Sequence, residues 1–155
     1  MDSKPSPAPK PAELTNFITY RLARVQARLN RQATRILRQK AGLSLVQWRV
    51  IALLKAHGAA TASEVTGYFD MDKGLFSRNV KTLIAAGLIK RQTNPDDQRE
   101  HQLELTVEGL EKYDQVFPTM QRRQQHLLHD LSAEQQALLF DAIDKINTNS
   151  AKTVF

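Results

Sequence analysis

Hydrogen-bond donors cluster in one short segment near the middle of the chain. Four of them fall on or beside one face of a predicted helix, namely Lys73, Ser77, Arg78 and Lys81. Its other face is apolar, with Phe76, Val80, Leu83 and Ile84. A helix anchored on its apolar side can present such donors to base edges and phosphates. Taken alone, the pattern also fits an ordinary surface helix with solvated charges.

The elements around this helix decide between the two interpretations. Capping boxes at Ser44 and Thr61 predict two short helices before it, over 44–56 and about 61–69. The donor-bearing helix is predicted over 73–86, and two strands follow over 88–93 and 101–105, with a turn between them. Two short helices, a donor-bearing helix and a hairpin follow one another in the order of a winged helix-turn-helix, which is a DNA-binding fold.

Long helices are predicted on both sides of this segment. An apolar stripe from Leu14 to Ile36 predicts a helix that runs to about Lys40 and stops at Gly42. A capping box at Ser132 opens a last helix near the end of the chain.

Between the hairpin and the last helix, Thr106 can cap a further helix. We expect Gly109 to weaken this helix slightly, because glycine has a low helix propensity. We expect Pro118 to start a new segment or to kink the helix, because proline lacks the backbone N–H.

The composition narrows the class of protein. A length of 155 residues suits one domain, and the absence of cysteine excludes disulfides, Cys-ligated zinc and thiol redox switches. No apolar run is long enough to span a membrane, and no signal peptide follows the N-terminus, so we expect a cytoplasmic protein without a membrane partner. Residues 1–11 contain four prolines, which predicts an extended, solvated tail.

Positive charge is concentrated near the start of the chain. Residues 1–55 hold 11 basic and 2 acidic residues, a net charge of +9. Residues 56–101 are neutral, and residues 102–155 hold 5 basic and 8 acidic residues, a net charge of −3. Such a distribution indicates nucleic-acid or membrane binding, or attraction between the basic and acidic segments.

Motifs that would indicate an enzyme or a metal site are missing from the sequence. It contains no dinucleotide-binding or nucleotide-binding glycine loop, no serine nucleophile elbow and no zinc-protease motif. His126 and His129 are one helical turn apart, but no cysteine or dense carboxylate cluster accompanies them, so we expect solvated side chains there. The sequence therefore predicts a protein that is not an enzyme and needs no metal or cofactor.

Several short motifs resemble those of the MarR family of bacterial transcriptional regulators. They are Gly42-Leu43-Ser44 with Gln47-Trp48, then Ser77-Arg78, Gly87-Leu88-Ile89, Asn94-Pro95-Asp96-Asp97-Gln98-Arg99 and Leu105-Thr106-Val107-Glu108-Gly109. The resemblance covers about residues 13–150. Its most specific part is the aspartate–arginine motif of the wing followed by Leu-Thr-x-x-Gly.

The resemblance implies a mainly α fold with a small β-hairpin wing. A winged helix-turn-helix at about 44–106 would lie between dimerisation helices at about 13–40 and 107–149, within a single domain over 12–150. The implied function is that of a homodimeric, ligand-responsive repressor that binds a pseudo-palindromic operator in double-stranded DNA. The alternative is a helical interaction module that pairs through its basic and acidic thirds without specific DNA binding.

The family pattern also assigns candidate DNA contacts. Ser77, Arg78 and Lys81 would face the major groove. Arg99 would enter the minor groove from the wing, which Asp97 would orient. Lys73 and Gly74 lie in the first turn of the predicted helix, where Gly74 allows a phosphate to approach the backbone. The family commonly has a second arginine where this chain has Gln98.

Aromatic residues and one arginine are candidates for an effector pocket, namely Phe17, Tyr20, Trp48, Arg49, Tyr113 and Phe117. This set would suit a small anionic ligand of aromatic or phenolic type. Taken singly, each aromatic residue fits core packing better.

An arginine stripe runs along the first long helix and consists of Arg21, Arg24, Arg28, Arg31, Arg35 and Arg38. We favour pairing of this stripe with acids such as Glu108, Glu111, Asp114, Asp141 or Asp144. Direct DNA contact remains the alternative, above all near Arg38 and Lys40.

Overall fold

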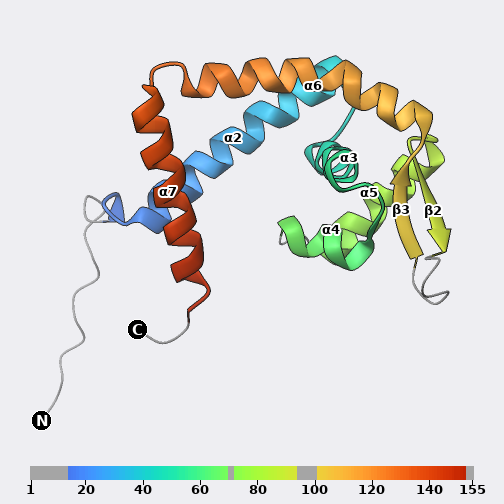
Figure 1. Ribbon diagram of the computed structural model, residues 1–155, viewed down its shortest axis with the longest axis horizontal. Helices are drawn as coiled ribbons and strands as arrows, with labels where there is room; N and C mark the ends of the chain where they lie inside the picture. The colour runs from blue at the N-terminus through green and yellow to red at the C-terminus, as the bar shows by residue number, and fades with distance from the viewer. Residues whose placement is uncertain (1–13, 70–71, 94–100, 153–155) are drawn as a thin grey trace, which may run out of the picture. The chain divides into compact units, whose positions relative to one another are not determined.

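The computed structural model describes residues 14–69, 72–93 and 101–152. The chain divides into two compact units, Met1–Val116 and Phe117–Phe155. The first unit contains helices and a small sheet, whereas the described part of the second unit is helical. The predicted fold class, mainly α with a β-hairpin, is confirmed (Figure 1).

The helices that the structure describes wholly within the first unit are α2 (Ile18–Ala41), α3 (Leu45–His57), α4 (Ala62–Phe69) and α5 (Lys73–Ala85). The predicted caps account for their ends. The capping box of Ser44 and Gln47 forms at the start of α3, with both reciprocal hydrogen bonds present. Gly42 ends α2 in the left-handed conformation with φ of 68°, which costs glycine little.

The sheet has three strands in the order β1-β3-β2, all antiparallel. The hairpin strands are β2 (Ile89–Thr93) and β3 (His101–Leu105), as predicted. The strand β1 (Ala60–Thr61) pairs with the other edge of β3 and was not predicted. Two residues are too few to show an alternating pattern, so this strand leaves no signal in the sequence.

The core of the first unit forms where α3, α5 and the hairpin meet. Its fully buried side chains are Leu37, Val50, Ile51, Leu54, Val65, Leu83 and Ile89. Full burial of an aliphatic side chain of this size stabilises the fold by about 1.5–3 kcal/mol. Of the apolar residues predicted for α5, Phe76, Val80 and Leu83 are buried and anchor the helix, whereas Ile84 is exposed.

A close contact joins the end of α5 to the start of α6 (Val107–Leu128). Thr106 Oγ1 donates to the Gly87 carbonyl at 2.6 Å and accepts from Gly109 N at 3.0 Å. Thr106 N donates to the Leu88 carbonyl at 3.2 Å. A Cβ atom on Gly109 would lie only 2.0 Å from that same carbonyl oxygen. The expectation that Gly109 merely weakens the helix therefore needs correction, because the missing side chain makes this contact possible.

The second unit contains the latter part of α6 and all of α7 (Ala133–Ser150). Pro118 lies inside α6, which continues to Leu128, so the expectation that it starts a new segment is wrong. Ser132 and Gln135 form the predicted capping box of α7. No residue of α7 is buried.

A membrane span would require a long helix of apolar residues. No helix among residues 14–69, 72–93 and 101–152 has both the length and the apolar character for this.

We predict that Gly109→Ala destabilises the protein by about 1–3 kcal/mol, because the new methyl group would force the start of α6 away from the Leu88 carbonyl. Urea unfolding followed by circular dichroism measures the change. Gly67→Ala in α4 is the matched control, since its Cβ would meet no atom within 4 Å. That control should be neutral or stabilising, because alanine has the higher helix propensity. Equal stability of Gly109→Ala and the parent protein would contradict the close contact.

Candidate nucleic-acid interface

The helix α5 is fixed at its start and along its buried face. Asp72 Oδ1 accepts a hydrogen bond from Leu75 N at 2.7 Å and so caps the helix. Phe76, Val80 and Leu83 are buried. The polar residues predicted to read DNA are exposed on this anchored helix, and they are Lys73, Ser77, Arg78 and Lys81.

Gly74 lies in the first turn of α5, close to two charged groups. A Cβ atom at this position would be 3.3 Å from Asp72 Oδ1 and 3.5 Å from Arg78 Nη1. The guanidinium of Arg78 therefore lies back along the exposed first turn of the helix. An alanine at position 74 would be in tight contact with Asp72 Oδ1 and in ordinary van der Waals contact with Arg78 Nη1.

The hairpin adds cations that sequence reasoning did not select. Arg91 pairs with Leu103 across the two strands, and Thr93 pairs with His101. Arg91 is two residues beyond the buried Ile89, so strand alternation places both on the same face of the sheet. This alternation was the signal that could have identified Arg91, since the face that carries Ile89 also faces α5.

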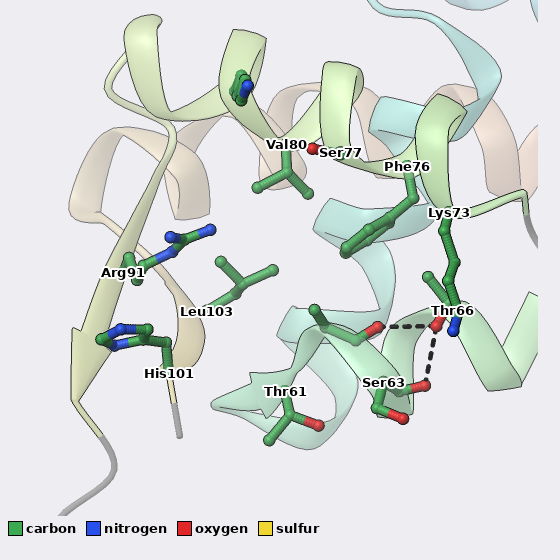
Figure 2. A pocket seen from close by; sticks show the side chains of 12 residues that line it. Thr61, Ser63, Thr66, Lys73, Phe76, Ser77, Val80, Arg91, His101 and Leu103 are labelled. Carbon is green, nitrogen blue, oxygen red and sulfur yellow. Dashed lines mark hydrogen bonds between the residues drawn. The ribbon is translucent and has the colours of Figure 1, made fainter. Parts of the chain in front are cut away.

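A groove of about 520 Å³ lies between α5, the start of α4 and the hairpin. Its cationic lining residues are Lys73, Lys81 and Arg91, and His101 lies beside them. Figure 2 shows Phe76 and Val80 from α5 and Arg91 and Leu103 from the hairpin pointing into the same space. Hydroxyl groups of Thr61, Ser63, Thr66 and Ser77 also line the groove. Such a lining offers hydrogen-bond donors and positive charge to an anion.

On its other face the hairpin carries a small polar cluster. Lys90 and Glu104 lie directly opposite each other and form an ion pair of 3.1 Å. Gln92 donates a hydrogen bond to the same carboxylate. Among the described residues of the two strands, Arg91 is thus the arginine or lysine that lines the groove.

The start of α4, on one side of the groove, is held by a capping box. Thr61 N donates to Glu64 Oε2 at 2.7 Å, and Glu64 N donates to Thr61 Oγ1 at 3.2 Å. The hydrogen bond from the Thr61 backbone lowers the pKa of Glu64 below its ordinary value of 4.5, and the Thr61 side chain acts in the same direction.

Two of the predicted DNA contacts, Asp97 and Arg99, lie outside the described residues, as does Gln98. The structure brings together the others that it describes, on one exposed surface of α5.

The predicted effector residues fall into separate groups. The rings of Trp48 and Tyr113 are stacked, with centroids 5.5 Å apart and planes 9° from parallel. Lys55 Nζ lies 5.8 Å from the centre of the Tyr113 ring. Burial raises the pKa of Tyr113, and the nearby Asp114 acts in the same direction.

Arg49 belongs to a different cluster of α3. Its Nη2 donates to Asn30 Oδ1 at 3.2 Å, and its guanidinium lies 5.5 Å from the centre of the Phe69 ring. Phe17 and Tyr20 are exposed near the start of α2, and Phe117 is an exposed residue of the second unit. Among the described residues of the first unit, Trp48 and Tyr113 thus belong to one cluster and Arg49 to another.

The arginine stripe is exposed along the whole of α2. Arg21 Nε donates to the Thr15 carbonyl at 2.7 Å. Among the described residues of the first unit, no ion pair joins an arginine of this stripe to an acid. Buried Ala33 and Leu37 lie on the opposite side of the same helix.

His126 and His129 lie near the end of α6. His129 Nδ1 lies 2.9 Å from Asp130 Oδ1, and both side chains are highly exposed. The described ranges contain no group of three or more His, Cys, Asp or Glu side chains that could hold a metal ion.

Comparison with known families identifies this architecture. Residues 41–100 match the model of the MarR family, and this stretch spans α3, α4, α5 and β2. Over these residues the chain is similar to the regulators of the MarR family. The expected resemblance is therefore confirmed, and transcriptional regulation is the role of this family.

Two curated relatives show how far the similarity extends along the chain. The uncharacterized HTH-type transcriptional regulator YdgJ of Bacillus subtilis is 25% identical over 108 residues, which cover 70% of this chain and 66% of the relative. The match thus spans just under two thirds of that relative. The HTH-type transcriptional repressor NicR of Pseudomonas putida is 24% identical over 145 residues, which cover 90% of this chain and 92% of the relative.

Solved structures share the fold. A MarR/EmrR family regulator from Acinetobacter has a TM-score of 0.80 at 22% identity, over 86% of this chain and 94% of its own. PcaV from Streptomyces coelicolor, in complex with its natural ligand, has a TM-score of 0.72 at 26% identity, over 90% and 96%. A mutant MarR from E. coli, complexed with operator DNA, has a TM-score of 0.67 at 23% identity, over 81% and 92%.

We predict that Glu64→Gln removes a pH-dependent contribution to stability. The carboxylate of Glu64 has a lowered pKa in the folded state, so it stabilises the fold above pH 4.5, and this stabilisation is lost as the pH falls through the folded-state value. The urea midpoint of the variant should lie below that of the parent at pH 7, and the two should converge in acid. Glu111→Gln, at an exposed position of α6, is the control. A difference that stays constant from pH 7 to pH 3 would refute this origin of the effect.

Proposed function

We propose that this chain is a transcriptional repressor that binds a pseudo-palindromic operator as a homodimer and is released by a small ligand. The observation that carries the proposal is the exposed, donor-bearing face of α5 beside a groove with three cationic side chains. The recognition helix α5 would read base edges, whereas lysines and arginines around the groove would bind phosphates. Arg99 and Asp97 of the wing are proposed contacts with the minor groove.

Exposed apolar side chains support the homodimer. On α2, Ile18, Leu22 and Val25 form one stripe, and Val25 is 51% exposed. On α7, Leu138 is 62% exposed and Ile143 is also exposed. An apolar surface of this kind on two helices is typical of a protein interface. A second copy that covered it would remove this surface from water.

The ligand is proposed to be a small aromatic or phenolic anion. PcaV, a structural neighbour, was solved with its natural ligand. In this chain the stacked Trp48–Tyr113 pair with Lys55, and Arg49 with Phe69, offer aromatic surface together with positive charge. Phe17 and Tyr20, which are exposed near the start of α2, complete the proposed set in the first unit. The ligand would act by stabilising a dimer whose recognition helices no longer match successive major grooves.

A gel shift with DNA from upstream of the chain's own gene, followed by footprinting, tests the proposed repressor. A protected palindrome whose half-sites are one helical turn apart is expected. Absence of any shift at micromolar protein, with an intact dimer, would favour the alternative of a helical interaction module without specific DNA binding.

Substitutions on the recognition helix should separate base reading from phosphate binding. If Arg78 contacts a base edge, Arg78→Ala should weaken operator binding by about 1–3 kcal/mol and reduce discrimination at one base pair. Lys81→Ala should instead weaken binding to all DNA by a similar factor and reduce the dependence on salt. Fluorescence anisotropy with the operator and with single-base variants measures both effects. Operator binding that is unchanged by Arg78→Ala would contradict the placement of this side chain.

The homodimer can be tested on one helix. Leu22→Asp should dissociate the protein, because the interface would bury an unpaired charge. Ala27→Asp is the matched control, since position 27 lies on the opposite side of α2 from Leu22 and is also exposed. Sedimentation velocity at micromolar protein should give a dimer for the control and a monomer for Leu22→Asp. A monomeric parent protein would exclude the proposed dimer.

A further inference from the structure

One side-chain hydrogen bond connects α5, the proposed recognition helix, to the N-terminus of α3, which lies far from it in the sequence. Ser44 Oγ, at the N-cap of α3, donates to Asn79 Oδ1 on α5 at 2.8 Å. The two residues are 35 positions apart in the sequence. Both side chains are half-buried, so the bond lies at the contact between the two helices.

The remaining polar atoms of both side chains are also engaged. Asn79 Nδ2 donates to the Leu75 carbonyl at 2.8 Å. Ser44 Oγ accepts from Gln47 N at 3.1 Å, and Ser44 N donates to Gln47 Oε1 at 2.8 Å. An asparagine on a recognition helix commonly reads adenine through these same amide atoms. Here both amide atoms bind protein, although Asn79 directly follows the exposed Arg78.

The position of Asn79 makes the bond sensitive to rotation of α5 about its own axis. A side-chain tip about 6 Å from the axis moves about 1 Å when a helix turns by 10°. Binding groups must be held within about 0.5 Å and 10–20° of their productive geometry. The apolar contacts of Phe76 and Val80 are not directional, whereas a hydrogen bond of fixed length is.

We propose that Ser44 and Asn79 form a positioning pair that sets the rotation of α5 on α3, so that Asn79 determines operator discrimination without contacting DNA. The inference rests on the proposed function of α5 as the recognition helix. It assigns Asn79 a role distinct from those of Ser77, Arg78 and Lys81, whose exposed side chains are the proposed DNA contacts.

The same pair connects α5 to α2, where the proposed dimer surface lies. Gly42 N donates to the Arg38 carbonyl at 3.2 Å, and Leu43 N donates to the Leu37 carbonyl at 3.3 Å. Leu43 is buried, and Ser44 follows it directly. A movement of the C-terminal end of α2 would therefore displace Ser44, and with it the hydrogen bond that orients α5.

Three variants test the pair. Asn79→Leu keeps the approximate shape of the side chain but removes both polar atoms of the amide, Oδ1 and Nδ2. Ser44→Ala removes the hydroxyl, and Ser44→Thr restores it. Ser132→Ala is the matched control, because Ser132 forms the same capping box in α7 without a hydrogen bond to α5 among the described residues.

The quantity to measure is the ratio of the dissociation constants for scrambled DNA and for the footprinted operator, at equal length and fixed salt. We expect Asn79→Leu and Ser44→Ala to lower this ratio by about tenfold, the loss typical of one misplaced base contact. Binding to scrambled DNA should stay unchanged. The double variant should lose no more than either single one, and Ser44→Thr and Ser132→Ala should keep the parent ratio.

The possible outcomes distinguish failure of the positioning pair from failure of the proposed function. Parent-like ratios for Asn79→Leu and Ser44→Ala, or an additive loss in the double variant, would overturn the positioning pair alone. A parallel loss on both DNAs would reduce the pair to a folding contact and overturn its proposed role. A parent protein that did not distinguish operator from scrambled DNA would overturn the proposed function and this inference with it. Should Ser44→Ala fail to fold, Asn79→Leu still decides, because it leaves the capping box intact.

Discussion

The approach of the first turn of α6 to the Leu88 carbonyl is the contact on which the rest of this fold depends. Thr106 donates hydrogen bonds to the Gly87 and Leu88 carbonyls just after α5, and Gly109 donates to Thr106 Oγ1. Only glycine at position 109 permits this approach, because a Cβ atom there would lie 2.0 Å from the Leu88 carbonyl oxygen. The end of α5, the hairpin of β2 and β3, and the start of α6 are therefore in contact at this position. If the start of α6 moved relative to α5 and the hairpin, the hydrogen bonds of Thr106 to the Gly87 and Leu88 carbonyls would have to move with it or break.

The positive charge of the groove beside α5 comes from two consecutive elements of the chain. Lys73 and Lys81 come from the helix, whereas Arg91 comes from the following strand. The ion pair of Lys90 with Glu104 lies on the other face of the hairpin, and none of the ion pairs among the described residues involves Lys73, Lys81 or Arg91. In β2, Lys90 thus stabilises the hairpin through its ion pair, whereas Arg91 on the opposite face is available to bind an anion.

The sequence predicted what depends on local chemistry. The capping boxes of α3 and α7, the left-handed end of α2 at Gly42 and the two hairpin strands all follow from residues within one or two turns of each other. The contacts that position the site could not be predicted in this way. Ser44 meets Asn79, and Gly109 meets Leu88, only after the helices have packed. Neither residue pair has a spacing that distinguishes it from its neighbours.

The central place of β3 has a consequence for the order in which the chain folds. Ala60 pairs with Leu103, so the β1–β3 ladder joins the two ends of the segment that holds α4, α5 and β2. Closing so large a loop costs entropy that helix formation does not. The helices can form first from local contacts, whereas the ladder must form late. Backbone amides of β1 should therefore exchange with solvent sooner than those of α3, and the start of α4 should open before the core does.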